Sequence, residues 1–414
     1  MNKCGMFRCL KTGLLASTAL WALAGAAGAQ GLAPLEREFA NGATLRFYGQ
    51  INKGILGYDD GVDTETYYVI DNDNSGTRFG FEYTQSFGDW TFGNVNEFRY
   101  APYSTANINI IDDSPSSGDY EWSNDNIRKI DFTLEHDRYG KFWLGQGSMA
   151  TDGVAEYDLS GTDVIGYSGV GDSAVAQIIR FSDPNLFFAD NPQIGETFQN
   201  YDGGRLARVR YDTPSFSGFS VAFAYGQDLL SGDDDERDIN QYDVSLNYEG
   251  EFETFAVAAG IGYYADDEDA EIWAGSASAL HTPTGINGSF SAGTQDFDGD
   301  NGTYWYGKLG LLRRFLAWGA SAAALDYYSG DDIFLTGDVQ LFDGDGDPVL
   351  DEDGNPVIGD ITSSESESWG VSMVQNIDAW NTELWLTWRS YDYADDFASY
   401  EDGQAIFGGA RFRF

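Results

Sequence analysis

Three basic side chains stand near the start of separate stretches in which apolar and polar residues alternate. They are Arg78, Lys129 and Arg208, and each falls on the polar side of its stretch. Fixed positive charges at similar depth on one wall act on ions and dipoles that pass them. Each of them could instead only neutralise a nearby carboxylate such as Glu82 or Glu97, and this alternative stays open. Further basic candidates are Arg46, Arg205 and Arg210.

Carboxylates that could oppose these cations lie in one segment without alternation, residues 147–204. The candidates are Asp152, Glu156, Asp158 and Asp163. A connection of this length in a compact domain is usually functional, disordered or wrongly assigned. Carboxylates that face basic residues would create a transverse field, which orders water and favours small polar solutes over apolar ones. We expect the functional part to lie between about Thr151 and Asp172.

Other motifs point to chemistry only weakly. Residues 71–82 fit the spacing of a calcium loop through Asp71, Asp73 and Glu82, but Arg78 stands where such loops carry an apolar residue. Residues 302–308 read GxxxxGK, yet Leu309 replaces the Ser or Thr that would bind magnesium. GDSA at 171–174 resembles a hydrolase motif without a well-placed histidine. We therefore expect no catalytic residue, no enzyme activity and no required cofactor.

The long connections hold most of the acidic residues. Residues 331–360 contain ten Asp or Glu and no Lys or Arg. These carboxylates could serve only the solubility of exposed loops. They could also bind Ca²⁺ or Mg²⁺ together with anionic groups outside the chain, because hard cations prefer oxygen ligands.

The elements that must position these residues are β-strands, since strict alternation recurs outside residues 147–204. Phe219, Val221, Phe223 and Tyr225, for example, alternate with Ser220, Ala222 and Ala224. The pattern predicts sixteen strands, at 43–57, 76–86, 90–100, 126–136, 140–146, 205–212, 218–227, 238–249, 252–264, 271–281, 286–295, 303–313, 316–328, 366–375, 380–391 and 404–414. Between successive strands, short turns alternate with long acidic connections.

The first 29 residues have the features of an export signal: a basic start, an apolar run and small residues before Gln30. Cleavage after Ala29 would remove both cysteines and three basic residues, which changes the net charge from −44 to −47. A chain this acidic is not expected to bind nucleic acid. Residues 30–414 show no linker and are expected to form one domain.

Strands of about ten residues, apolar on one face and polar on the other, are typical of an outer-membrane β-barrel. Only helices or a closed barrel can satisfy the backbone in lipid. The sequence therefore predicts an all-β fold, a sixteen-stranded antiparallel transmembrane barrel.

Four short motifs resemble bacterial general porins, in particular the alphaproteobacterial branch. They are YGQIN at 48–52, TRFGFE at 77–82, RVRYDTPSFSGF at 208–219 and RFRF at 411–414. The resemblance implies a homotrimer, a long third loop folded into the lumen, and a role for Phe414 in barrel assembly. Arg78 and Lys129 match basic positions of this pattern, whereas around Arg208 the match slips, so that Arg205 or Arg210 could replace it.

Together these observations predict a general diffusion porin in the outer membrane of a Gram-negative bacterium, exported through the periplasm. Ions and small hydrophilic solutes would diffuse passively, and the acidic mouth predicts cation preference. Expected partners are two further copies, outer-membrane lipid and lipopolysaccharide. Alternatives are an eighteen-stranded substrate-specific channel, or a secreted acidic β-protein that binds calcium or sugar.

Overall fold

Sixteen antiparallel strands form a closed ring in the computed structural model, which describes residues 34–110, 122–183, 186–188, 192–231, 236–297, 300–343, 347–351 and 354–414. The predicted export signal, residues 1–29, lies outside these residues. The wall strands are β2 (Thr44–Asp59), β4 (Arg78–Phe87), β5 (Trp90–Arg99), β6 (Ile127–His136), β7 (Gly140–Ser148), β9 (Arg205–Asp212), β10 (Phe219–Gln227), β11 (Gln241–Phe252), β12 (Phe255–Asp266), β13 (Glu271–His281), β14 (Ile286–Phe297), β15 (Asp300–Leu316), β16 (Gly319–Asp331), β19 (Ser364–Ile377), β20 (Thr382–Asp395) and β21 (Gly403–Arg413).

Ring closure comes from β2, which pairs with β4 on one side and with β21 on the other. The predicted number of wall strands, sixteen, is confirmed. Two further strands belong to the same sheet without enlarging the ring: β1 (Leu35–Glu38) and β3 (Thr64–Asp71) each pair with one part of β2. The sequence did not predict β3, because a register shift opposite Gly54 and a left-handed Val69 (φ 60°) break its alternation.

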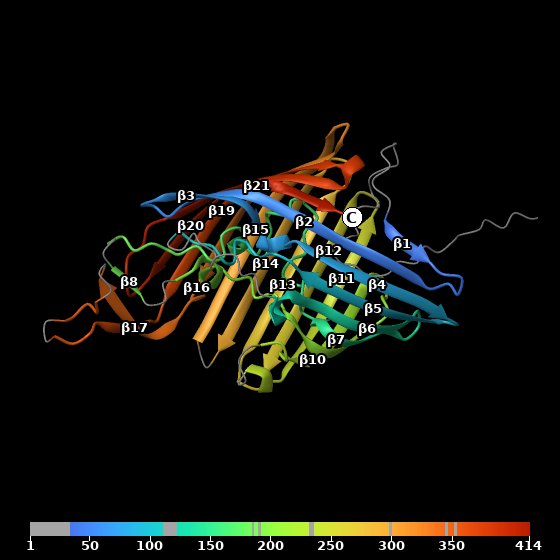
Figure 1. Cartoon of the computed structure of the whole chain (residues 1–414), viewed down its shortest axis with the longest axis horizontal. Helices are drawn as coiled ribbons and strands as arrows, with labels where there is room; N and C mark the ends of the chain where they lie inside the picture. Colours follow the sequence, from blue (N-terminus) through green and yellow to red (C-terminus); the bar gives the residue numbers. More distant parts are fainter. Residues whose placement is uncertain are drawn as a thin grey trace, which may run out of the picture.

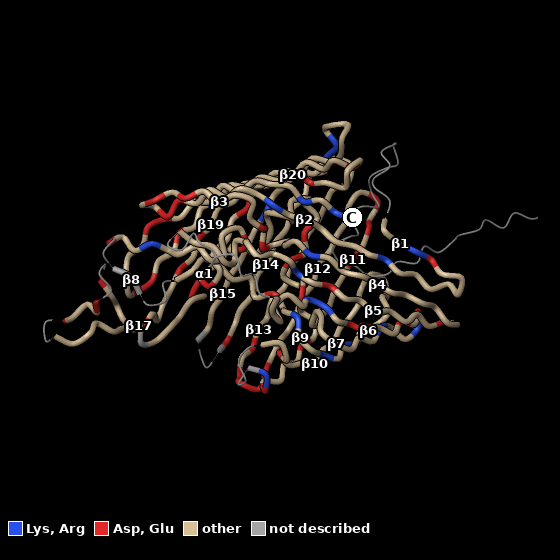
Figure 2. Tube along the Cα trace, viewed as in Figure 1, with Lys and Arg blue, Asp and Glu red and all other residues tan. Residues whose placement is uncertain are grey.

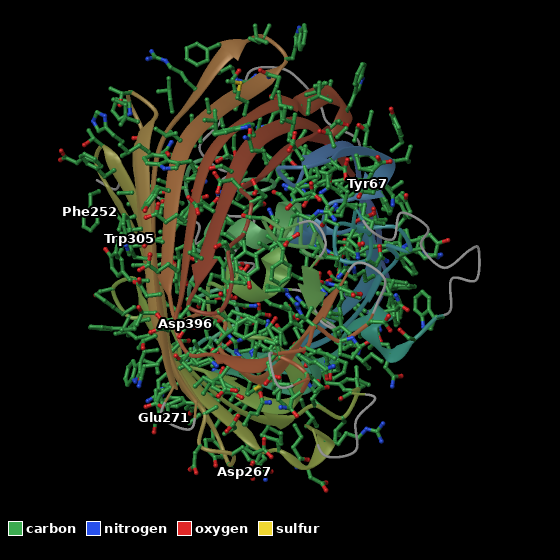
Figure 3. The ribbon with its side chains drawn as sticks, turned by 90° about the vertical axis from the view of Figure 1, so that its left-hand side faces the viewer. Tyr67, Phe252, Asp267, Glu271, Trp305 and Asp396 are labelled. Carbon is green, nitrogen blue, oxygen red and sulfur yellow. The ribbon has the colours of Figure 1, made fainter. Side chains whose placement is uncertain are left out.

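The two faces of the wall differ in the way that alternation predicts. Ile261, Trp273 and Phe290 on neighbouring strands are each about half exposed on the outer face. Ser276, Ser278 and Ser291 on the same strands are buried on the other face. Trp305 and Phe252 lie on the outside of the ring in Figure 3. An apolar outer face around a polar inner face suits a wall with lipid outside and water inside.

The wall is not uniform in height. Strands β4, β5, β6, β7, β9 and β10 have 8–10 residues each and form what we call the short wall. Strands β11–β16, β19, β20 and β21 have 11–17 residues each and form the tall wall. In Figure 1 the long connections extend to the left, beyond the ring, and the C-terminus lies at the right.

Little regular structure lies outside the wall. The strands β8 (Leu186–Phe188), β17 (Thr336–Asp343) and β18 (Ile358–Ile361) form a small separate sheet among the long connections. The helix α1 (Ile194–Thr197) is one turn, and single 3₁₀ turns occur at Asp73–Ser75, Asn124–Asn126, Val170–Ser173, Glu236–Asp238 and Asp378–Trp380. Within the described chain, no helix has the length and apolar character needed to cross a membrane.

Candidate functional site

The connection between β7 and β9, residues 149–204, is the feature on which the candidate site depends, and we call it the long segment. It follows the fifth wall strand, as the sequence predicted. It begins two residues later than the predicted break at 147, because β7 continues to Ser148.

The start of the long segment is fixed by a buried ion pair. Arg208 of β9 is 4 % exposed and forms two hydrogen bonds with Asp131 of β6, at 2.7 and 2.9 Å. The same guanidinium donates to the carbonyl oxygens of Gly145 and Ser148, where the chain leaves β7. Arg208 therefore neutralises a carboxylate and holds backbone, as in the alternative that the sequence left open.

Two further side chains hold the next residues. Arg210 pairs with Asp212 at 2.7 Å and donates to the carbonyl of Met149 at 2.5 Å. Asp243 of β11 accepts hydrogen bonds from the backbone N–H of Ala150 and from both N–H and hydroxyl of Thr151. Neither Arg208 nor Arg210 thus has an uncompensated charge.

Further along, the long segment is bonded to polar side chains of the tall wall. Ser276 accepts a hydrogen bond from the N–H of Tyr157 at 2.8 Å, and Ser278 accepts one from Leu159 at 2.9 Å. Asp158 lies 2.5 Å from Lys308 of β15. Later carbonyls accept from Tyr391 (Val170), Ser366 (Thr197) and Tyr328 (Gln199).

An apolar cluster fills the space between the long segment and the tall wall. From the long segment it includes Ile165, Val170, Ile179, Ile194 and Phe198. From the wall it includes Tyr304, Tyr306, Tyr328, Trp385, Tyr391 and Phe407, among others. Both sets are buried, so this side of the long segment is packed like a protein core.

On the short wall, four basic side chains lie within electrostatic reach of one another. We call Arg78, Arg128, Lys129 and Arg205 the basic wall; three of them surround Glu97 of β5. Glu97 lies 2.7 Å from Arg128 and 3.8 Å from Arg78, and it is the cross-strand partner of Lys129. In the described part of the chain, no carboxylate lies within 4.0 Å of Lys129. Glu97 therefore balances only part of the positive charge around it.

Arg128 was not predicted, and a β-bulge explains why. In the pairing of β5 with β6, Glu97 lies opposite Lys129 and the next residue, Phe98, lies opposite Ile127. Arg128 is therefore skipped and has no cross-strand partner on β5. A bulged residue departs from strict alternation. Arg128 therefore contacts Glu97, the cross-strand partner of its neighbour Lys129, and the adjacent pair of basic residues was the signal that could have found it.

Four carboxylates of the long segment form an acidic cluster, consisting of Asp152, Glu156, Asp172 and Asp202. Asp152 lies 3.5 Å from Arg205, where the acidic cluster meets the basic wall. Asp202 accepts from the backbone of Gly153 and Ala155. Among the described residues, no Lys or Arg nitrogen lies within 4.0 Å of Glu156, Asp172 or Asp202. Asp172 and Asp202 were not among the predicted residues.

The shared surroundings of these carboxylates change their acidity. Burial, together with the negative charges of Asp152 and Asp172, raises the pKa of Glu156 to about 8. Burial raises the pKa of Asp172 to about 6, although the Tyr167 hydroxyl and Arg99 act in the opposite direction. Burial, with Glu156 and Asp152 nearby, also raises the pKa of Asp202. The charge of the acidic cluster therefore changes near neutral pH.

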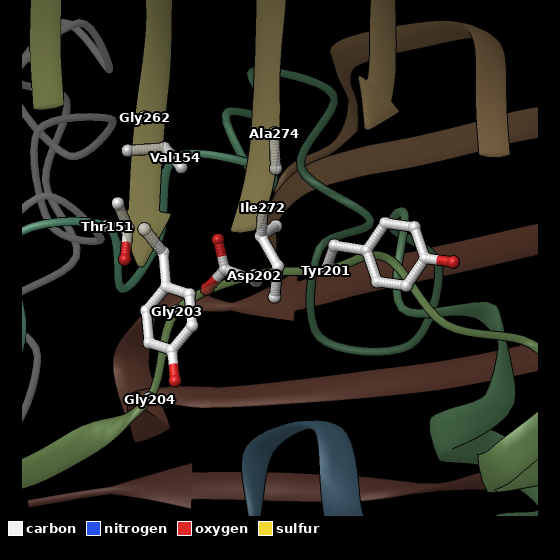
Figure 4. A pocket seen from close by; sticks show the side chains of 10 residues that line it. Thr151, Val154, Tyr201, Asp202, Gly203, Gly204, Gly262, Ile272 and Ala274 are labelled. Atoms are coloured by element: carbon white, nitrogen blue, oxygen red, sulfur yellow. The ribbon is translucent and has the colours of Figure 1, made fainter. Parts of the chain in front are cut away.

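Asp202 also lines a small cavity of about 80 Å³ between the long segment and strands β12 and β13 (Figure 4). Thr151, Val154 and Tyr201 line it from the long segment, and Ile272 and Ala274 from β13. Most of this lining is apolar, and the cavity is too small for a solute beyond a few waters. We assign it no site of its own.

Three other predicted residues lie away from the place where the basic wall meets the acidic cluster. Asp158 is bonded to the tall wall through Lys308, and Asp163 lies within electrostatic reach of Arg411 and Arg413. Arg46 is the cross-strand partner of Glu82 on the polar face. Figure 2 shows blue and red segments mixed in the middle of the ring and mostly red segments in the long connections at the left.

The weak calcium candidates have other partners. Asp71 pairs with Lys53 at 3.0 Å, and Asp73 pairs with Arg99. Over the described ranges, no group of three or more His, Cys, Asp or Glu side chains could hold a metal ion. The geometry therefore adds no support to a calcium site at Asp71, Asp73 and Glu82.

Phe414 lies at the closure of the ring. Its backbone exchanges two hydrogen bonds with Gly49 of β2, at 3.0 and 3.1 Å. Its ring packs 5.7 Å from that of Phe47, and a Cβ at position 49 would lie 2.6 Å from it. This contact suits the predicted role in assembly, which remains a prediction.

Comparison with known proteins gave consistent results at the level of family and fold. The sequence pattern of a family described as Gram-negative porin matches residues 16–396. An anion-selective porin from Comamonas acidovorans shares 15 % identity and a TM-score of 0.55, covering 90 % of this chain and 100 % of that one. OmpF of Salmonella typhi, in complex with daunomycin, shares 13 % identity and a TM-score of 0.52, covering 91 % and 99 %. The trimer form of Vibrio cholerae OmpT shares 14 % identity and a TM-score of 0.51, covering 90 % and 99 %. No curated protein sequence matched the chain.

Proposed function

The chain belongs to the Gram-negative porin family, a family of outer-membrane channels rather than enzymes, and we propose that it is a general diffusion porin. Ions and small hydrophilic solutes would cross it passively through a water-filled lumen. The ring of sixteen strands gives no support to the eighteen-stranded alternative.

The proposal puts the long segment inside the lumen. Its support is the set of hydrogen bonds from polar-face side chains of the tall wall, such as Ser276, Ser366 and Tyr391, to the backbone of the long segment. The opposite face of the same strands carries exposed apolar residues that suit lipid. A segment bonded to the polar face of the tall wall would narrow the passage from that side.

The observation that carries the proposed mechanism is the approach of Asp152 to Arg205 at 3.5 Å. There the acidic cluster of the long segment meets the basic wall, so charges of opposite sign border the same passage. Low-dielectric walls strengthen the field between such charges. Solutes with polar groups would align in this field, whereas apolar solutes would have to displace ordered water without compensation.

We also propose a preference for cations. The chain carries 67 Asp and Glu against 23 Lys and Arg, and its long connections are rich in carboxylates. A negative mouth raises the local concentration of cations. The basic wall acts in the opposite sense, so the preference would be modest. The anion-selective neighbour, at 15 % identity, supports the fold alone.

The test is single-channel recording of the purified protein in planar bilayers under a salt gradient. We expect steady conductance with a reversal potential of the sign for cations. An absence of conductance would contradict the pore, and a reversal potential of the opposite sign would contradict cation preference. Conductance that one solute blocks saturably would favour a substrate-specific channel instead.

We further propose a homotrimer in contact with lipid and lipopolysaccharide. One structural neighbour is a trimer form. Exposed carboxylates at the long-connection end, such as Asp267, Glu271 and Asp396 in Figure 3, would share Ca²⁺ or Mg²⁺ with lipopolysaccharide phosphates. Mass measurement in detergent would contradict the trimer if it gave a monomer. Thermal unfolding followed by calorimetry, with and without Ca²⁺, would test whether the protein binds these ions.

A further inference from the structure

A buried lysine joins the tall wall to two points of the long segment. Lys308 of β15 is 3 % exposed, and its Nζ lies 2.5 Å from Asp158 Oδ2. The same Nζ donates to the carbonyl oxygen of Gly166 at 2.5 Å. Lys308 is the lysine of the GxxxxGK match, and it serves here as an anchor for the backbone rather than as a ligand for phosphate.

The contacts around this anchor leave little room for movement. The second carboxylate oxygen of Asp158 accepts hydrogen bonds from the N–H of Ser160 at 2.8 Å and from the hydroxyl of Ser289 at 3.2 Å. A Cβ at Gly166 would lie 2.3 Å from the hydroxyl oxygen of Ser372, so the backbone of the long segment touches the wall there.

A buried ion pair of this kind contributes little net stability, because the cost of removing both charges from water offsets their attraction. Its contribution to a unique position is greater, since either charge is unfavourable without the other. Asp158 is two residues from Glu156 of the acidic cluster. The position of Asp158 therefore affects the distance between the acidic cluster and the basic wall.

We infer that Lys308 is a positioning residue, which holds the long segment against the tall wall through Asp158 and Gly166 and so fixes the width of the passage. The inference rests on the proposed function, in which the long segment narrows the pore. Without the anchor, the long segment would move between positions, and the current through an open pore would fluctuate.

The test compares the parent protein with the variant Lys308→Met in planar bilayers. We expect the variance of the open-channel current to rise at least threefold and closures to occur at voltages where the parent stays open. Lys308→Arg, which keeps the positive charge, should return the variance toward the parent value. The double variant Lys308→Met, Asp158→Asn should remain noisy, because the anchor is still absent. A quiet double variant would mean that only the unpaired carboxylate caused the noise, and it would overturn the inference.

A matched control is the second buried pair of the tall wall. Arg389 of β20 is 1 % exposed, lies 2.8 Å from Asp326 and donates to Ser368. These partners are wall residues, and the hydrogen bonds and ion pairs within the described residues do not join Arg389 to the long segment. Asp326 is also the cross-strand partner of Lys308, so the control variant removes both charges of the pair and leaves no unpaired carboxylate beside the anchor. Arg389→Met, Asp326→Asn should lower the thermal stability and leave the current variance at the parent value. Equal noise in both variants would show general loosening and overturn the inference.

The outcomes separate this inference from the proposed function. A parent protein that does not conduct contradicts the pore itself. A parent that conducts, with a folded Lys308→Met variant of unchanged conductance and noise, overturns the positioning role. If Lys308→Met does not fold, Gly166→Ala replaces it, because the added Cβ would push the long segment away from Ser372. Gly166→Ala should also raise the variance of the open-channel current. A folded Gly166→Ala variant with the variance of the parent would overturn the inference.

Discussion

The two sides of the long segment use their charges differently. Toward the tall wall, Lys308 and Asp158 are buried and matched one to one beside an apolar cluster. Toward the short wall, the basic wall and the acidic cluster are only partly buried, and their charges are not matched in pairs. Matched buried charges fix a position and produce little field at a distance. Unmatched charges beside water keep a field that acts on solutes. Under the proposed function, the same connection is an anchor on one side and a filter on the other.

The largest effect that would test this comparison is on stability. Arg208→Ala leaves Asp131 buried without its partner and should lower the free energy of unfolding by about 3–5 kcal/mol. Arg128→Ala removes one cation beside Glu97, but Arg78 and Lys129 remain near that carboxylate, so the loss should be smaller, about 1–2 kcal/mol. Urea unfolding of both variants in detergent measures the difference. Similar losses for both would remove the distinction between anchoring and field-producing charges.

A smaller effect is expected on ion selectivity. The triple variant Arg78→Ala, Arg128→Ala, Lys129→Ala removes three cations near the passage, so the cation-to-anion permeability ratio should rise about threefold or more. Reversal potentials under a salt gradient measure this ratio. The control triple, Arg138→Ala, Arg313→Ala, Arg314→Ala, makes the same change in total charge near the short turns. The basic wall would lose its proposed role if both triples changed the ratio equally.

The smallest effect is on the pH dependence of selectivity. Because the pKa of Glu156 is raised to about 8 and that of Asp172 to about 6, both side chains are mostly neutral at pH 5.5 and mostly charged at pH 9. Burial favours the neutral form of each carboxyl group, so these groups stabilise the folded protein most at low pH. This stabilisation is lost as the pH rises through the two pKa values. Cation preference should therefore increase, by about twofold, between pH 5.5 and 9. The variant Glu156→Gln, Asp172→Asn, Asp202→Asn should show no such increase. An increase of the same size in this variant would assign the pH effect to other groups.

Alternation predicted most of the wall, because its period depends only on neighbouring residues. It gave the number of strands and the polar orientation of Arg78 and Lys129. Bulges interrupt the period at Val69 and Arg128, and there the prediction missed one strand and one basic residue. The partners of Arg208 and Asp158 depend on strands that are distant in sequence, 77 and 150 residues away. Local patterns carry no information about such pairs, so the division of charges between anchor and filter required the structure.

The pairing of β2 with β21 has a consequence for assembly. It joins the first wall strand to the last, so the ring closes only after all the other strands are in place. Joining such distant parts of a chain has a high entropic cost, and contacts of this kind form late and slowly. Until then, β2 and β21 present unpaired edges, which are prone to pair with other chains. The time between synthesis and closure is therefore the period in which this protein is most exposed to aggregation.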